Sequence, residues 1–295
     1  MTGLPLPPVP EPYCLPFHYG ALHNIGVDYL VEPEQARRLL DKRHPGLAVA
    51  AFDGGACVSL NYQLYFAQYP NGGGITEELE INLIAHPVFA EDRVPVVNYG
   101  QYARGYDQTK LLGIARLHVL CDNPLAIDAG RRLYAEPKHP GWFETTLPSL
   151  NAPAVRERWS VSCRRAELGA DGPGEGGPGV GGPGEGGLRR HQEEILALDV
   201  DLTGLTPESV SSTPITGYGT DDEGKLLAGP LNVHQPYRYY ALDDRTAGRV
   251  RLDLGNPAEE AARDLALLIG DAPAAGVWTY QSAPVAAHQR PYYVR

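Results

Sequence analysis

Alternation of apolar and polar residues is the strongest pattern in this chain, and it predicts a protein built mainly from β-strands. In the segment 76–88, leucine and isoleucine alternate with glutamate and asparagine, so Glu78 and Glu80 project from the same face of the expected strand. Apolar and β-branched residues between turn-forming residues predict further strands. These lie at 47–53, 57–67, 113–121, 156–168, 191–201, 209–218, 226–234, 237–254, 276–287 and 291–294.

Helical spacing of apolar residues occurs in only three segments. One covers 32–42 and another 257–269. The third begins at Asn123, which suits a helix N-cap because Pro124 follows it, and it ends before Pro137. Lys138 is therefore expected just past a helix end, on a turn packed against the sheet.

Many strands with few helices favour an α+β fold, a mostly antiparallel sheet or barrel, over alternating βαβ units. We expect the whole chain, 1–295, to form one domain. Residues 1–12 form a proline-rich, extended arm. Residues 169–188 contain tandem GPGEG and GPGVG sequences that bury too little apolar surface to fold, so we expect a disordered loop within the domain.

Composition and charge narrow the class of protein. The formal net charge of −11 argues against binding to nucleic acid or to an anionic membrane. No apolar run reaches the roughly 18 residues that a membrane helix needs, and the first residues do not resemble a signal peptide. The four cysteines form no CxxC pair, so we expect free thiols and a cytoplasmic protein.

Common catalytic and cofactor motifs receive little support. Residues 219–225 have the spacing of a phosphate-binding loop, but Leu226 replaces the Ser or Thr that would bind magnesium, and a hairpin turn explains the segment better. No GxSxG or HExxH sequence occurs, and the histidines lack metal-ligand spacing, so we expect no metal site. His118, in the middle of its strand, is most simply a hydrogen-bonded core histidine.

One lysine stands out. Only four of the 25 basic residues are lysines, namely Lys42, Lys110, Lys138 and Lys225, and the other 21 are arginines. A lysine amine can attack a carbonyl, whereas arginine stays protonated. Burial, or a charged neighbour such as His139, lowers the pKa of an amine. Lys138 is therefore the candidate nucleophile.

The segment that contains this lysine resembles the hallmark of the acetoacetate decarboxylase-like superfamily. The matching residues are Asp122, Asn123, Ala126, Ile127, Gly130, Arg131, Leu133, Pro137 and Lys138. The resemblance implies a cone-like antiparallel β-barrel with flanking helices, a Schiff base at Lys138, no cofactor and a homo-oligomer. Activation of the lysine by a neighbouring cation is the established mechanism of the decarboxylase itself, so here it is inherited from the resemblance.

The chain departs from the family pattern at two positions. The family's second lysine is His139 here, and no arginine or lysine precedes Arg37, so an N-terminal active-site arginine is missing. Arg104 or Arg116 could replace it in binding a substrate carboxylate. The family's acidic residue matches Glu80 best, with Glu78 as the second choice. We keep His118 and His139 with Arg104 and Arg116 as candidate substrate contacts.

The sequence therefore predicts a cofactor-independent lyase that forms a lysine Schiff base with a small 2- or 3-oxo acid. The missing arginine favours aldol condensation and dehydration over decarboxylation of an acetoacetate-type substrate. A second hypothesis is a non-catalytic barrel of the same fold that only binds small molecules. A protein-interaction module that uses the arm or the glycine-rich segment rests on composition alone.

Overall fold

The computed structural model describes residues 5–69, 72–149, 157–169, 188–211, 214–233, 237–282 and 286–294. The glycine-rich segment expected to be a loop lies outside the described residues from 170 to 187, as do the first four residues of the expected arm. Strands make up most of what is described, and few helices accompany them. The expectation of a mostly antiparallel α+β fold is confirmed.

Seven strands pair edge to edge and close a ring. Their order around it is β1, β4, β5, β6, β11, β12 and β16, and β16 pairs again with β1. Only the β6–β11 pairing is parallel. The strands are β1 (Phe17–Val31), β4 (Gly55–Tyr69), β5 (Gly72–Pro87), β6 (Gly113–Cys121), β11 (Ile215–Thr220), β12 (Leu226–Val233) and β16 (Ala286–His288). The ring confirms the barrel-like arrangement.

Other strands extend the sheet from the ring. A second group runs from β6 through β7, β8 and β9 to β14, with a parallel β6–β7 pairing and antiparallel pairings after it. It comprises β7 (Lys138–Thr146), β8 (Arg158–Leu168), β9 (Leu188–Asp201) and β14 (Val250–Leu254). The remaining strands are β2 (Leu47–Val49), β3 (Ala51–Phe52), β10 (Glu208–Val210), β13 (Tyr237–Ala241), β15 (Ala274–Ser282) and β17 (Tyr292–Tyr293).

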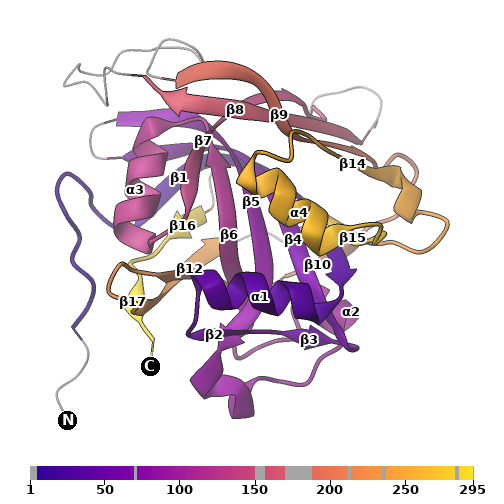
Figure 1. Ribbon diagram of the computed structural model, residues 1–295, viewed down its shortest axis with the longest axis horizontal. Helices are drawn as coiled ribbons and strands as arrows, with labels where there is room; N and C mark the ends of the chain where they lie inside the picture. The colour runs from indigo at the N-terminus through magenta and orange to yellow at the C-terminus, as the bar shows by residue number, and fades with distance from the viewer. Residues whose placement is uncertain are drawn as a thin grey trace.

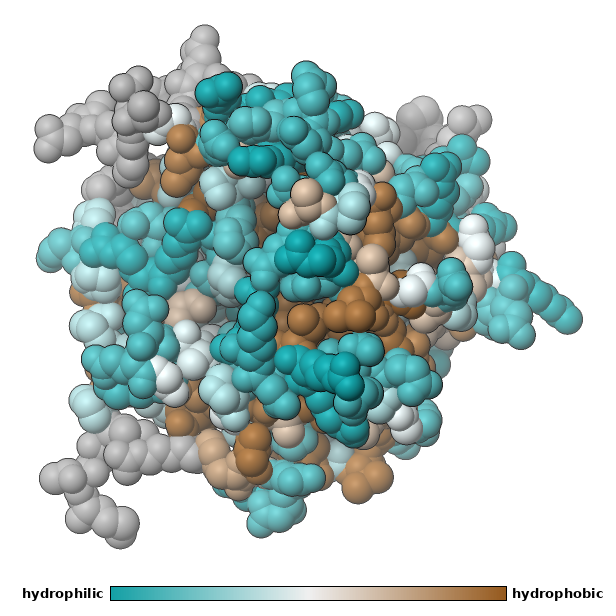
Figure 2. All heavy atoms as spheres, in the orientation of Figure 1, coloured by the Kyte–Doolittle hydropathy of each residue, from teal (hydrophilic) through white to brown (hydrophobic). Residues whose placement is uncertain are grey.

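Helices α1 and α4 pack on the outside of the ring. In Figure 1, α1 and α4 lie across the long central strands, β8 and β9 cross one end, and α3 stands at the side. Figure 2 shows the face over α1 and α4 as largely hydrophilic around a small hydrophobic patch. The α-helices are α1 (Pro33–Arg43), α2 (Tyr99–Ala103), α3 (Pro124–Tyr134) and α4 (Glu260–Ile269), and the 3-10 helices are η1 (Val88–Arg93) and η2 (Ala247–Arg249). No helix in the described parts of the chain has the length and apolar character needed to cross a membrane.

The main apolar core lies outside the ring, and polar side chains line its interior. Along β5, Leu79, Ile81 and Leu83 are fully buried in the core shared with α1, α4 and β9. Glu78 and Glu80 face the interior, as the period of two predicts. Strand β5 is buried on both faces, yet its apolar and polar residues alternate, because the polar face lines the interior cavities.

Several predicted boundaries were wrong. Strand β5 begins at Gly72, before the predicted start at residue 76. The segment expected as one strand at 237–254 is two strands, β13 and β14, because the turn that Asp243 stabilises by accepting from the backbone N–H of Arg245 separates them. Lys138 does not lie on a turn but is the first residue of strand β7.

Candidate active site

Lys138 opens strand β7 where strand β6 changes its partner. Strand β6 pairs with β11 at Ile114 and Ala115, and with β7 from Val119 onward, opposite Lys138. Arg116 lies between these two pairings. The side-chain guanidinium of Arg131, at the end of α3, donates a hydrogen bond of 2.9 Å from Nε to the carbonyl oxygen of Lys138. These contacts fix the backbone and direct the lysine side chain into the ring.

Helix α3 approaches Lys138 closely because it carries a glycine at the contact. A Cβ atom at Gly130 would lie 2.5 Å from Cε of Lys138 and would also collide with the Glu136 carboxylate. The side chain of Asn123 caps the start of this helix, accepting from the backbone N–H groups of Leu125 and Ala126. A side chain at position 130 would therefore push the ends of the Lys138 and Glu136 side chains out of their present positions.

Two carboxylates contact the amine of Lys138, which is 5% exposed. Its Nζ lies 2.6 Å from Oε2 of Glu78 and 3.3 Å from Oε2 of Glu136. Burial disfavours the charged amine, but the two carboxylates outweigh it and hold the pKa of Lys138 well above its ordinary value. For Glu78, burial raises the pKa of the carboxyl and the charge on Lys138 only partly opposes this. Glu78 is therefore the nearest carboxylate that could accept a proton from the Lys138 amine.

Arg116 forms a second ion pair beside the first. Its Nε lies 2.7 Å from Oε1 of Glu80, and a terminal nitrogen lies 3.5 Å from Oε1 of Glu136. The amides of Asn61 and Asn82 donate to the other oxygen of Glu80 at 3.1 and 3.0 Å. Burial works against ionisation of Glu136, but Arg116 and Lys138 together lower its pKa to about 2. Three carboxylates and two cations thus form one continuous buried network.

The amine of Lys138 faces a cavity of about 40 Å³ inside the ring. Strands β1, β4, β12 and β16 and helix α3 supply the remaining walls, which are largely aromatic: Phe17, Tyr19, Tyr65, Tyr69, Tyr134 and His288. The ring of His288 stacks on Tyr134 with centroids 4.0 Å apart, and burial lowers the pKa of His288 to about 3. The cavity can hold a small carbonyl compound next to a lysine amine and an acceptor for its proton.

Several solved structures resemble this chain in fold, and their names describe decarboxylases and a biosynthetic enzyme bound to pyruvate. The enduracididine biosynthesis enzyme MppR, complexed with pyruvate, has a TM-score of 0.60 and 14% identity over 95% of this chain and 90% of its own. An acetoacetate decarboxylase-like enzyme from Sphingomonas wittichii RW1 has a TM-score of 0.56 and 13% identity, covering 95% of this chain and 92% of its own. The acetoacetate decarboxylase of Legionella pneumophila has a TM-score of 0.55 and 10% identity, over 99% and 92%.

This chain has the acetoacetate decarboxylase-like fold. No protein-family model and no curated protein matches its sequence. The structural likeness therefore carries the assignment of the fold. It agrees with the resemblance found in the segment from Asp122 to Lys138.

Within this decarboxylase-like fold, the structure does not bring His139 to the amine of Lys138. Successive residues of a strand point to opposite faces, and His139 follows Lys138 in β7. His139 pairs with Leu120 of β6, is exposed, and lies on the outer side of the ring. The neighbours that set the pKa of Lys138 are carboxylates, which raise it, so the expected lowering by a cation at position 139 was wrong.

His118 and Arg104 also lie outside the cavity. A β-bulge at Leu117 places His118 opposite Ile81, on the outer face of the ring, where its Nε2 lies 2.7 Å from Oδ2 of Asp264 in α4. Arg104 pairs with Glu208 near the surface, at 2.6 Å. Of the four candidate substrate contacts, Arg116 alone lines the cavity.

The structure adds two residues that the sequence did not single out. Glu136 reaches Lys138 because Ala135 adopts a left-handed conformation, with φ of 52°, at the end of α3. Its place two residues before the lysine is a signal that could have been used. His288 comes from the other end of the chain, and nothing local in the sequence indicates its position. No group of metal-ligating side chains occurs among the described residues.

Proposed function

We propose that this protein is a cofactor-independent lyase in which the amine of Lys138 forms a Schiff base with a small 2- or 3-oxo acid. The observation that carries the proposal is the 2.6 Å contact between Nζ of Lys138 and the Glu78 carboxylate inside the cavity. A lysine nucleophile needs a neighbouring base, because its ammonium form has no lone pair. Glu78 is well suited to that role because burial raises its pKa.

The chemistry begins with transfer of a proton from Lys138 to Glu78. The free amine attacks the substrate carbonyl carbon, and one of its two remaining protons moves to the carbonyl oxygen, which gives a carbinolamine. Glu78 then returns its proton to that hydroxyl, the C–O bond breaks, water leaves, and the nitrogen lone pair forms the C=N bond of the iminium. The resulting iminium draws electrons from the adjacent carbon. That carbon can then lose carbon dioxide, or it can lose a proton and attack an aldehyde, after which elimination of water gives a conjugated product.

Among these outcomes we favour aldol condensation followed by dehydration. Arg116 is already bound by Glu80 and Glu136, and no arginine or lysine occurs before Arg37 to hold a substrate carboxylate in the position that the decarboxylases use. The structural neighbour MppR has been captured with the condensation product of pyruvate and imidazole 4-carboxaldehyde. Absorbance of a conjugated product from pyruvate and an aldehyde would support this reaction, and carbon dioxide release from acetoacetate would support decarboxylation.

The proposal is tested by trapping the iminium. Protein incubated with pyruvate or acetoacetate and reduced with borohydride should gain the mass of one adduct, which peptide mapping places on Lys138. Lys138→Arg should abolish the adduct, since guanidinium is not an amine nucleophile. The matched variant Lys110→Arg should keep it. An unmodified wild-type mass with every keto acid of a panel would refute the Schiff base.

One observation favours a second candidate, a barrel that binds small molecules without reacting. The pKa of Lys138 is raised, so the resting amine is protonated and bound to carboxylates. In that case Lys138→Arg would retain ligand binding, measured by calorimetry, and no adduct would form on the wild-type protein.

A further inference from the structure

The ring encloses a second cavity that the Schiff-base chemistry does not use. Its volume is about 90 Å³, compared with about 40 Å³ beside Lys138. Asn61 and Asn82 line it, and their amides also hold Glu80 of the Lys138 network, so this pair of side chains separates the two cavities. The second cavity extends from these two asparagines toward α2 and the segment that precedes β6.

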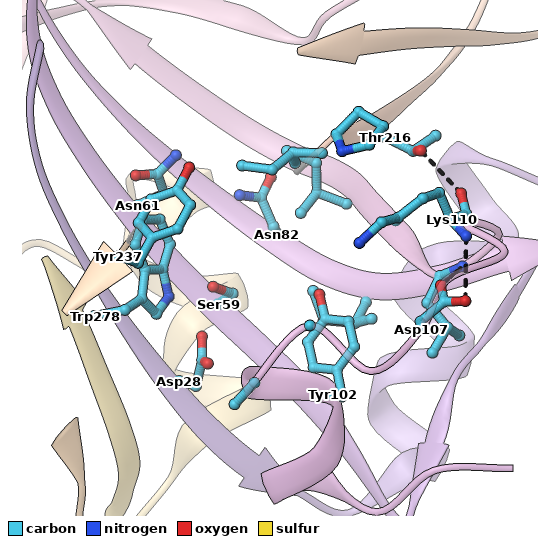
Figure 3. A pocket seen from close by; sticks show the side chains of 18 of the residues that line it. Asp28, Ser59, Asn61, Asn82, Tyr102, Asp107, Lys110, Thr216, Tyr237 and Trp278 are labelled. Carbon is cyan, nitrogen blue, oxygen red and sulfur yellow. Dashed lines mark hydrogen bonds between the residues drawn. The ribbon is translucent and has the colours of Figure 1, made fainter. Parts of the chain in front are cut away.

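The walls of this cavity combine a large apolar surface with a few polar groups, which is typical of small-molecule sites. Figure 3 shows Tyr237 and Trp278 on one side and Tyr102 below, with its hydroxyl pointing inward. Aliphatic side chains complete the lining: Ile84, Leu112, Ile114, Val210 and Ile215. A ligand with a flat or compact apolar body would be enclosed by these groups.

Lys110 supplies a cation to the cavity. Its side chain extends into the space in front of Asn82 (Figure 3). The backbone of Lys110 is held at φ of 56°, a left-handed conformation that is unfavourable for a residue other than glycine. The loop is fixed in this strained form because Asp107 accepts from the backbone N–H of Lys110 and Thr216 donates to its carbonyl oxygen. Such strain at a half-buried lysine is typical of a functional position.

A second, independent observation that indicates a ligand is a buried acceptor atom of Asn82. It is 1% exposed, and its Oδ1 atom has no hydrogen-bond partner among the described residues, although its amide nitrogen donates to Glu80. A buried acceptor without a partner destabilises the folded protein, and a hydrogen-bond donor on a bound molecule would remove that cost. The side chain faces the same space as the Lys110 amine.

The two acidic residues of the lining do not exclude an anion. The Oδ1 atom of Asp107 accepts hydrogen bonds from the backbone N–H groups of Thr109 and Lys110, and Oδ2 accepts one from the backbone N–H of Leu112. For Asp28, burial raises the pKa of the carboxyl and favours its neutral form, although a hydrogen bond from Tyr99 works in the opposite direction.

We propose that this cavity is a second binding site, for a small carboxylic acid with an aromatic or compact apolar body and a hydroxyl group. The carboxylate binds the ammonium of Lys110, the body packs against Tyr237 and Trp278, and the hydroxyl donates to Oδ1 of Asn82. The site needs no covalent step and does not depend on Lys138 forming a Schiff base.

The test uses 4-hydroxybenzoate as the probe, with 4-hydroxybenzamide and benzoate as matched compounds, in calorimetric titrations of the full chain. The probe should bind, and loss of its charge or of its hydroxyl should weaken binding about tenfold, the factor that 1.4 kcal/mol represents. Lys110→Gln should weaken binding of 4-hydroxybenzoate by a similar factor and leave binding of 4-hydroxybenzamide unchanged. The exposed lysine in Lys225→Gln serves as the control and should have no effect.

Lys138→Met separates this site from the proposed active site, because binding of the probe should survive a change that abolishes keto acid adducts. If Lys110→Gln does not fold, Ala103→Leu is the substitute, because it narrows the same cavity without changing the loop of Lys110. It should also weaken binding of the probe. The proposal is overturned if the wild-type protein does not bind the probe, or if binding is lost in Lys138→Met and kept in Lys110→Gln.

Discussion

Glu78 receives hydrogen bonds from two side chains that differ in acidity, the amine of Lys138 at 2.6 Å and the hydroxyl of Tyr65 at 3.1 Å. Burial raises the pKa of Glu78, and the carboxylates hold the pKa of Lys138 above its ordinary value. Both shifts act on the same proton, which Glu78 has to accept before the amine of Lys138 can attack a carbonyl. In the proposed Schiff-base reaction, this proton transfer has to occur before the amine can attack the substrate.

The first prediction concerns the pH dependence of that transfer, measured as the rate of adduct formation with pyruvate under cyanoborohydride. In the wild-type protein the rate should fall as the pH falls through the raised pKa of Glu78, because protonated Glu78 cannot accept a proton. In Glu78→Gln the rate at pH 7 should drop by about 10²–10⁴, the usual contribution of a positioned base. What remains should rise with pH as Lys138 itself loses its proton.

Glu77→Gln is the matched control for this prediction. Glu77 is the next residue in β5, but it accepts hydrogen bonds from Tyr62 and Thr145 on the outer side of the ring. Its removal should leave the rate profile unchanged. Equal profiles for Glu78→Gln and the wild-type protein would show that Glu78 is not the proton acceptor.

At the scale of elements, the site depends on how α3 meets β7. The helix ends at Tyr134, Ala135 turns the chain, Glu136 faces inward, and Lys138 begins the strand. The contact is possible only because position 130 has no side chain. Alanine normally stabilises a helix interior relative to glycine by about 1 kcal/mol, so the effect of a methyl group here separates packing from helix propensity.

Gly130→Ala should therefore reduce adduct formation at least about tenfold, since the new methyl group displaces the Lys138 side chain by steric collision. The measurement is the trapping rate together with the thermal unfolding temperature. Gly248→Ala, where a Cβ would meet nothing within 4 Å, is the control and should leave both unchanged. A Gly130→Ala protein that reacts at the wild-type rate would exclude the proposed placement of the lysine.

In β5, β6 and β7 the sequence predicted some side-chain positions correctly and others wrongly. The period of two in β5 correctly predicted that Glu78 and Glu80 share a face, and the capped helix before Pro137 was also found. His139 was misplaced because a turn was expected where β7 begins, and in a strand neighbouring side chains diverge. His118 is the hydrogen-bonded core histidine that its place in the strand predicted, buried against Asp264. Its second assignment, as a substrate contact, was wrong because the bulge at Leu117 places it on the outer face, which no local pattern reveals.

At the scale of the whole molecule, pairings between distant segments close the ring and create its interior. Strand β16 joins β1 and β12, and it brings His288 to the cavity of Lys138. Such contacts are set by the complete topology, so composition and periodicity predicted a barrel-like fold without its closure or its second cavity. They also predicted that the glycine-rich segment interrupts one domain between two strands, and that prediction is still open.

The last prediction tests that organisation. Strands β8 and β9 are antiparallel, and Leu168 pairs with Leu188, so the two ends of the segment lie side by side in the ladder. A two-residue Asn-Gly turn is the favoured connection for such a pair. A protein in which Asn-Gly replaces residues 169–187 should unfold in one transition, within about 2–4 °C of the wild-type temperature. It should form the Lys138 adduct at the wild-type rate. If the segment instead separates two domains, the shortened chain should lose the pairing of β8 with β9, and calorimetry should show two transitions or none.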